Sequence, residues 1–233
     1  MQLLLENKGD LNIRDKDYNN VLDYACFNKN FKFEDLKFLL NKKAQLNVKK
    51  SGPGTLHKYL ENSNVQYDCF SYFLEKKCPV NSPDKNLNSV LHLSTINEHM
   101  NHKCYQLLFS IKKLKVNITN KEGNSALHLL CDKTNLNLDL FRLFFKQKFD
   151  VNLKNNYGKS PLYKLCSNKN IQLDILKFML ENGCDPTPQN NTSNSCVSLI
   201  KENEKVSKEI QELFRIDVDQ FFVKFSKIKL KNK

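Results

Sequence analysis

Two markers recur in step along the whole chain, and this recurrence constrains the fold more than any other feature. One marker is a position that follows a leucine in most lines and is filled by Asp23, His57, His92, His128, Tyr163 and Ser198. The other is an asparagine, found as Asn12, Asn47, Asn81, Asn117 and Asn152. Both advance by about 35 residues each time, a period that is typical of stacked solenoid repeats. The sequence therefore predicts an array of similar units that shield one another.

The content of one unit is clearest between residues 117 and 152. A turn at 120–123 is followed by a short apolar segment at 125–131, a polar break at 132–137 and a second apolar segment. In the second segment Leu140, Phe141, Phe144 and Phe145 are spaced as on one face of a helix. Helices this short are not stable alone. We therefore predict an all-α fold of stacked helix pairs joined by β-turn or hairpin loops.

The turn and first helix resemble the ankyrin repeat, whose pattern contains a turn, the motif T-P-L-H-x-A, and a later G-A-D-x-N. The lines that carry the resemblance are Gly123-Asn-Ser-Ala-Leu-His128, Gly158-Lys-Ser-Pro-Leu-Tyr163 and Glu181-Asn-Gly-Cys-Asp185. Ankyrin repeats are about 33 residues long. The extra residues here fall in the loop between the two helices, because the spacing from His128 to Phe144 exceeds that of the family.

The phase of the markers suggests three segments. Residues 1–13 are expected to be a partial N-terminal repeat, 14–220 an ankyrin array of about six repeats with a degenerate last repeat as a cap, and 221–233 a basic amphipathic tail. The tail spacing predicts a helix over 219–230 with three possible roles. It could fold back on the last repeat, lead into a further domain, or contact a membrane surface or an acidic partner.

Helix ends are also marked. Polar N-caps are expected at Asn20, Ser89, Ser125, Ser160 and Ser195. Pro161 follows its cap at the first helical position, where the missing N–H does no harm. The second repeat departs from this pattern around Gly52-Pro53, where we expect a local distortion. Gly183 is expected to adopt a left-handed conformation after the preceding helix.

The cysteines and histidines are interpreted as structural. Cys26, Cys131 and Cys166 share one repeat position and are expected to be small buried residues in a reducing compartment, and the eight cysteines show no zinc-site spacing. We expect no metal and no cofactor. The structural repeat positions are His57, His92 and His128. Because no signal peptide or membrane span is apparent, we expect an intracellular protein, cytoplasmic with nuclear location also open.

The formal charge of +12 is distributed unevenly. Five lysines without an acid among them fall at the very end of the chain: Lys224, Lys227, Lys229, Lys231 and Lys233. The rest of the excess is spread over the array. Such lysines either keep a long solenoid soluble or favour a protein partner with an acidic surface. Binding of nucleic acid is disfavoured, and would show affinity that falls steeply with salt.

No catalytic motif appears, so we expect a non-catalytic protein. The resemblance implies a monomeric scaffold or adaptor that binds another protein through hairpin tips and the concave face of the inner helices. Alternatives are a regulatory or targeting segment of a larger signalling protein, such as a kinase or GTPase regulator, or a host-interaction effector. The residues expected to bind the partner are Arg14, Lys16, Asp17, Phe27, Lys49, Lys50, Lys85, Asn86, Lys121, Glu122, Lys154, Asn156 and Tyr157.

Overall fold

The structure is a computed structural model that describes residues 10–47, 53–186, 195–214 and 217–226. These residues form thirteen helices and contain no strand. The predicted all-α class is confirmed. Leu4/Leu5, Lys49, Lys50 and the tail lysines beyond Lys224 lie outside the described residues.

The helices alternate between a short inner one and a longer outer one. The inner helices are α2 (Val21–Cys26), α4 (Thr55–Leu60), α6 (Val90–Ile96), α8 (Ala126–Cys131), α10 (Pro161–Ser167) and α12 (Cys196–Glu202). The outer helices are α3 (Phe33–Asn41), α5 (Tyr67–Glu75), α7 (His102–Phe109), α9 (Leu138–Phe145), α11 (Leu173–Glu181) and α13 (Glu204–Phe214). One more helix, α14 (Val218–Ser226), follows the last pair.

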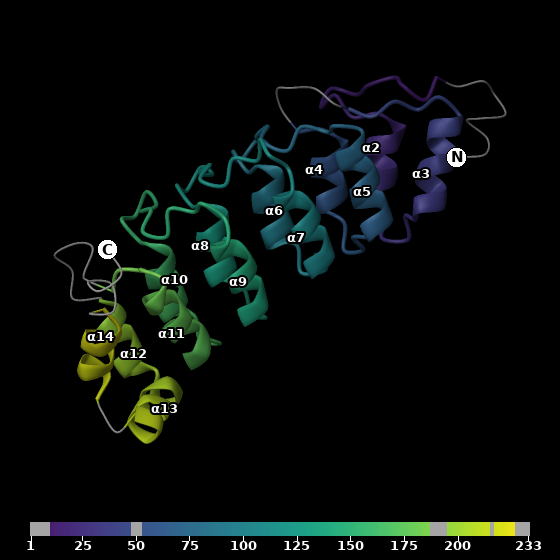
Figure 1. The fold of residues 1–233 in the computed structure, drawn as a ribbon. Coiled ribbons are helices and arrows are strands. Elements are labelled where there is room, and N and C mark those ends of the chain that lie inside the picture. The colour runs from purple at the N-terminus through teal and green to yellow at the C-terminus, as the bar shows by residue number, and fades with distance from the viewer. Residues whose placement is uncertain (1–9, 48–52, 187–194, 215–216, 227–233) are drawn as a thin grey trace. The chain divides into compact units, whose positions relative to one another are not determined.

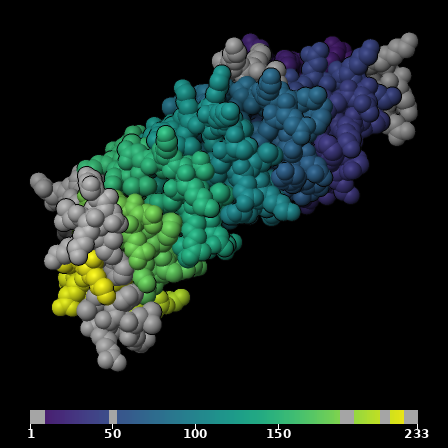
Figure 2. All heavy atoms as spheres, viewed as in Figure 1, coloured from purple at the N-terminus to yellow at the C-terminus, as the bar shows by residue number. Residues whose placement is uncertain are grey.

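The chain divides into an N-terminal unit, Met1–Leu114, and a C-terminal unit, Lys115–Lys233. In the N-terminal unit α2, α4 and α6 pack in order, as do α3, α5 and α7 (Figure 1). In the C-terminal unit α8, α10 and α12 form the inner row, and α9 packs against α11. Within the N-terminal unit the atoms of successive repeats are in contact across the visible face (Figure 2). Each unit is thus a stack of helix pairs, as the period predicted.

Apolar side chains on facing sides of the helices form the core. Phe70, Phe73 and Tyr59 are fully buried in the N-terminal unit, and Phe141 and Phe144 in the C-terminal unit. The rings of Tyr59 and Phe73 lie 5.1 Å apart between an inner and an outer helix. Burying an aromatic side chain of this size stabilises the fold by roughly 1.5–3 kcal/mol. The helices persist because of this packing, since segments of six to eleven residues do not hold a helix in water.

In three of the repeats, an asparagine in the loop between the paired helices bonds to the repeat before it. The Asn62 amide Nδ2 donates to the carbonyls of Cys26 and Asn28, both at 2.7 Å. Asn97 and Asn168 make the same pair of bonds to the preceding repeat. These are the loops in which the extra residues were expected. The insertion therefore supplies a hydrogen-bonded connection that satisfies the last carbonyls of the inner helix.

The asparagine marker makes a second connection, at the other end of the repeat. The Asn152 amide donates to the Gly183 carbonyl at 3.0 Å, and its Oδ1 accepts from the Asp185 N–H at 2.8 Å. Asn12 and Asn117 make equivalent bonds to the next repeat. Asn47 differs, because its Nδ2 turns to the Pro53 carbonyl in its own hairpin. A distortion was expected around Gly52-Pro53. Gly52 lies outside the described residues, and the changed bond of Asn47 to Pro53 is the departure seen next to it.

The C-terminal unit ends on a helix that packs back onto the array. α14 contacts α11, α12 and α13, and its Phe221 and Phe222 are buried. Val218 begins this helix, so it runs across the boundary expected at residue 220. Three roles were considered for the tail. Residues 218–226 take the first of them, because they fold back on the last repeats. Within the described ranges, every helix is too short or too polar to cross a bilayer.

Candidate interaction groove

Each well-formed hairpin tip is organised by one Asx side chain. Oδ1 of Asp84 accepts from the backbone N–H groups of Asn86 and Asn88, at 2.7 and 2.8 Å. The same pair of bonds is made by Asp15, Asn120 and Asn155 in their own tips. An Asx side chain that satisfies two N–H groups fixes the turn without a strand. Each tip therefore has a fixed turn, in which the two residues after the Asx are exposed.

The fourth residue of each of these tips has a left-handed backbone. Gly123 and Gly158 occupy this position with φ of 76° and 70°, whereas Tyr18 and Leu87 occupy it with φ of 61° and 60°. Glycine adopts this region without steric cost, but an L-residue with a side chain does not. The N-terminal unit thus has strained tips with a large exposed side chain on each.

The inner helices of the two units offer different surfaces. Two positions per repeat, one and four residues after the His position, lie on one face of the inner helix, and all of those described except the buried Leu93 are at least partly exposed. In the N-terminal unit they hold Tyr24 and Phe27, Lys58 and Glu61, and Leu93 and Ile96. Ile96 is 51% exposed and Phe27 40%. In the C-terminal unit Lys164 instead pairs with Asp132 of the preceding repeat at 2.9 Å.

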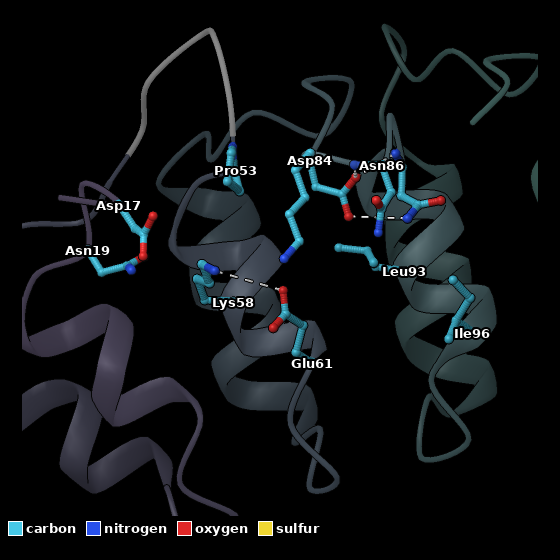
Figure 3. Close-up of a pocket in the computed structure, with 11 residues that line it drawn as sticks. Asp17, Asn19, Pro53, Lys58, Glu61, Asp84, Asn86, Leu93 and Ile96 are labelled. Atoms are coloured by element: carbon cyan, nitrogen blue, oxygen red, sulfur yellow. Dashed lines mark hydrogen bonds and ion pairs between the residues drawn. The ribbon is translucent and has the colours of Figure 1, made fainter. Parts of the chain in front are cut away.

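In the N-terminal unit these side chains and the tips enclose a groove of about 520 Å³. Figure 3 shows Asp17 and Asn19 on one side of it, Lys58 and Glu61 on α4, and Leu93 and Ile96 on α6. Among the residues that the structure describes, the lining is Asp17, Asn19, Pro53, Lys58, Glu61, Asp84, Lys85, Asn86, Asn88, Leu93 and Ile96. The groove thus combines an apolar wall with a charged floor, which is the composition of many binding sites for protein segments.

The charges on the floor are nearly balanced. The Lys58 ammonium lies 4.0 Å from Glu61 and 5.2 Å from the centre of the Phe27 ring. Asp17, Glu61 and Asp84 oppose Lys58 and Lys85 along the lining. At the edge, the Tyr24 hydroxyl donates to Asp15, and this bond lowers the pKa of the Asp15 carboxyl and raises that of Tyr24. The groove itself is therefore not a basic surface.

The structure brings together only part of the predicted binding set. Asp17, Lys85 and Asn86 line the groove, and Phe27 lies beside it under Lys58. Lys16 is exposed on the first tip. Arg14 is held against its own tip, because its guanidinium donates to the Tyr18 carbonyl at 2.9 Å.

The remaining predicted residues belong to the C-terminal unit. Lys121, Glu122, Lys154 and Tyr157 are exposed on their tips, and Tyr157 is 65% exposed. Asn156 has a structural use, since its amide donates to the Lys121 carbonyl at 2.8 Å and its N–H to the Glu122 carbonyl at 3.0 Å. These two bonds join neighbouring tips. Asn156 is thus partly withdrawn from recognition.

Sequence reasoning missed the groove residues that come from the inner helices. Lys58, Leu93 and Ile96 were not among the predicted residues, although each stands one or four places after a His position. This spacing could have identified them from the sequence, because residues one and four places after the histidine lie on the same face of the helix. The hairpin tips alone do not make the groove; the inner helices supply its floor and its apolar wall.

The histidines at the repeat position accept hydrogen bonds from backbone N–H groups at the starts of the inner helices α4, α6 and α8. The N–H groups of Gly54, Ser89 and Ser125 donate to Nδ1 of His57, His92 and His128 at 3.1–3.2 Å. A backbone N–H can only donate, so Nδ1 must accept, and the ring is a neutral imidazole with its proton on Nε2. Nε2 of His57 then donates to the Ser82 carbonyl at 2.8 Å. Nε2 of His128 donates likewise to the Lys159 carbonyl at 3.0 Å.

These bonds change the expected caps. Oγ of Ser125 lies 2.9 Å from Nδ1 of His128 rather than on a backbone N–H, and Ser89 makes the same contact with His92. Asn20, Ser160 and Ser195 accept from a backbone N–H as expected. The histidine therefore takes the part that Glu or Gln plays in a capping box. Among the described residues, no three His, Cys, Asp or Glu side chains form a group that could hold a metal ion.

Acidification should destabilise the fold through His57. Burial lowers the pKa of His57 below its usual 6.5, and the backbone bond to Ser82 opposes this only in part. A folded-state pKa below the unfolded one means that the unfolded chain binds more protons, so stability is constant above pH 6.5 and falls below it. Urea unfolding at pH 7.5 and pH 5 measures the loss. In the variant His57→Gln, which keeps an acceptor for the Gly54 N–H, the loss should be smaller; an unchanged loss would contradict this assignment.

Stacked helix pairs with projecting hairpin tips define a helical repeat protein. A family model for ankyrin repeats, in three copies, matches residues 91–190. These residues are ankyrin repeats, and the resemblance of the 123–128 and 158–163 motifs is confirmed. No curated protein matches the chain. Ankyrin repeats are in general protein-interaction modules without catalytic activity, and repeats of this kind present one extended binding face.

Proposed function

We propose that the protein is a non-catalytic scaffold that binds another protein through the groove of its N-terminal unit. The observation that carries the proposal is the exposure of Phe27 and Ile96 on either side of Lys58 and Glu61. Apolar side chains at the centre of a concave surface, ringed by polar tips, are where binding energy concentrates. The inner face of the C-terminal unit gives less support, because the positions equivalent to Phe27 and Ile96 hold the polar residues Asp132, Ser167 and Glu202 there.

The chemistry of the groove selects a segment with an apolar side chain between polar or charged neighbours. The apolar group would rest on Leu93 and Ile96, and its neighbours would face Lys58 and Glu61. Because the lining holds acids and lysines in nearly equal number, a strongly acidic partner has no special preference for this groove. An intracellular location fits the proposal, since all eight cysteines are buried as free thiols.

A peptide display library tests the proposal. Peptides selected by the wild-type protein are expected to bind the variant Ile96→Asp at least about tenfold more weakly, which corresponds to about 1.4 kcal/mol and is typical of a central contact. Tyr67→Asp is the matched control, because Tyr67 is 41% exposed at the start of α5, outside the groove. Equal binding to wild type and Ile96→Asp, or equal loss in both variants, would refute the groove as the binding site.

A further inference from the structure

Pairs of lysines follow three consecutive outer helices of the N-terminal unit. Lys42-Lys43 follow α3, Lys76-Lys77 follow α5 and Lys112-Lys113 come shortly after α7, and all six side chains are exposed. We call these six residues the lysine edge. None of them lines the groove.

The six lysines lie along one side of the unit. α3, α5 and α7 are equivalent helices that pack in order, so their C-terminal ends lie at the same edge (Figure 1). The backbone confirms the equivalence of the ends. Asn12 donates to the Lys43 carbonyl at 2.9 Å, and Asn81 donates to the Lys113 carbonyl at 2.7 Å. The lysine edge is therefore a row of positive charge that advances by one pair per repeat.

The charge of this row is not neutralised within the part of the chain that the structure describes. Ion pairs between described residues, such as those of Lys58, Arg142, Lys164, Lys201 and Lys208, involve no lysine of the edge. Lys42 and Lys76 lie over the rings of Phe38 and Tyr72 on their own helices. Such contacts hold a lysine without cancelling its charge.

Two lysines of the edge occupy a position that favours glycine. α3 and α5 end in a Schellman motif, in which the Ala44 N–H donates to the Leu39 carbonyl and the Cys78 N–H to the Phe73 carbonyl. The left-handed residue of the motif is Lys43, with φ 67°, in the first and Lys77, with φ 58°, in the second. α11 ends in the same motif, and there the residue is Gly183 with φ 89°.

The helix dipole does not explain this choice. A lysine near a helix C-terminus is favourable, but Lys42 and Lys76, at the cap position with ordinary φ, already provide that charge. A second lysine in the left-handed position adds strain at a site where glycine fits. Strain that is kept at an exposed position points to a role outside the fold.

We propose that the lysine edge is a second docking surface, which binds an acidic segment of a polypeptide. A row of ammonium groups complements a row of carboxylates along an extended chain. A protein segment fits better than a nucleic acid, because the edge consists of lysines alone and contains no arginine for bidentate phosphate contacts. The acidic partner suggested by the net charge is thus assigned to this edge and not to the groove.

The variant Lys43→Gly/Lys77→Gly tests the proposal, because it separates binding from folding. Removing strain should raise the melting temperature, while removing two charges should weaken binding of a labelled oligoglutamate peptide about fivefold at low salt. Binding is measured by fluorescence anisotropy at several salt concentrations, where the affinity of the wild type should decrease as salt rises.

The control variant Lys29→Gln/Lys103→Gln changes the net charge equally. Lys29 lies in the loop before α3 and Lys103 in the first turn of α7, both at the opposite ends of the outer helices. It should bind oligoglutamate like the wild type.

Equal binding by the glycine variant and the wild type, or equal weakening in the control, would overturn the proposal. Tighter binding of a single-stranded oligonucleotide of equal charge would overturn the choice of a polypeptide. Because Ile96 is not part of the edge, Ile96→Asp should bind oligoglutamate normally, so this test is independent of the groove.

Discussion

Replacing Phe144 with alanine is expected to destabilise the protein by about 3–5 kcal/mol, the cost of emptying a fully buried aromatic site. Phe144 has no exposed surface, and its ring stacks on that of Phe149 at a centroid distance of 5.2 Å. It packs at the end of α9, next to the hairpin that begins the following repeat. The loss therefore includes contacts between repeats as well as within one. Unfolding in urea, followed by circular dichroism, measures the effect.

The neighbouring residue provides the control. Phe145 is half-buried and meets Phe178 edge-on at 5.1 Å. Phe145→Ala should therefore cost only about 1 kcal/mol. If the two substitutions cost the same, the assignment of Phe144 to the core and Phe145 to its margin is wrong.

Replacing Gly123 with alanine should cost about 2–4 kcal/mol, an unusually large effect for adding one methyl group at a hairpin tip. The left-handed backbone accounts for about 1–2 kcal/mol of this. The rest arises because the new Cβ would lie 2.4 Å from Oδ1 and 2.5 Å from the backbone N of Asn156. That backbone N–H is the group that donates to the Glu122 carbonyl, so the contact between tips would have to open.

Leu87→Gly is the reverse experiment at the equivalent position of another tip. Leu87 has φ of 60° and its side chain is 45% exposed, so removing it relieves strain and loses little packing. We expect a stabilisation of about 0.5–1 kcal/mol, since the entropy cost of glycine offsets part of the gain. Thermal unfolding of both variants gives the comparison. A stabilised Gly123→Ala or a strongly destabilised Leu87→Gly would show that the tips do not have the conformation described.

The repeat phase predicted the fold well because it reflects periodic burial. His57, His92 and His128 recur at one spacing, and the structure places each at the start of an inner helix. The left-handed Gly183 was also predictable, since few other residues suit that position. Features that recur once per repeat, or that only a few residue types can provide, can be predicted from the sequence.

Contacts between repeats were harder to predict. Nothing in the sequence of one repeat predicts that the amides of Asn62 and Asn168 each join two carbonyls of the preceding repeat. Asn156 looked like a binding residue and instead connects two tips. Such roles depend on how neighbouring repeats are placed in space. One repeat considered alone does not contain that information.

The groove was predictable only in part for the same reason. Asp17 and Lys85 come from different tips, and Ile96 comes from an inner helix between them and the core. Stacking brings these residues together although about eighty positions separate the first from the last. Charged residues in the turns were enough to predict that the tips contribute to the site. The apolar wall could be predicted only by knowing which face of each inner helix is turned away from the core.

Hydrogen exchange with a selected peptide bound tests the central claim most directly, namely that the N-terminal groove is the surface that receives a partner protein. Mass spectrometry should show slower exchange around Asp17, around Glu61 and across residues 84–97 when the peptide is present. Outer helices α3 and α5 should exchange as in the free protein. Protection confined to the outer helices, or to the C-terminal unit, would contradict the account.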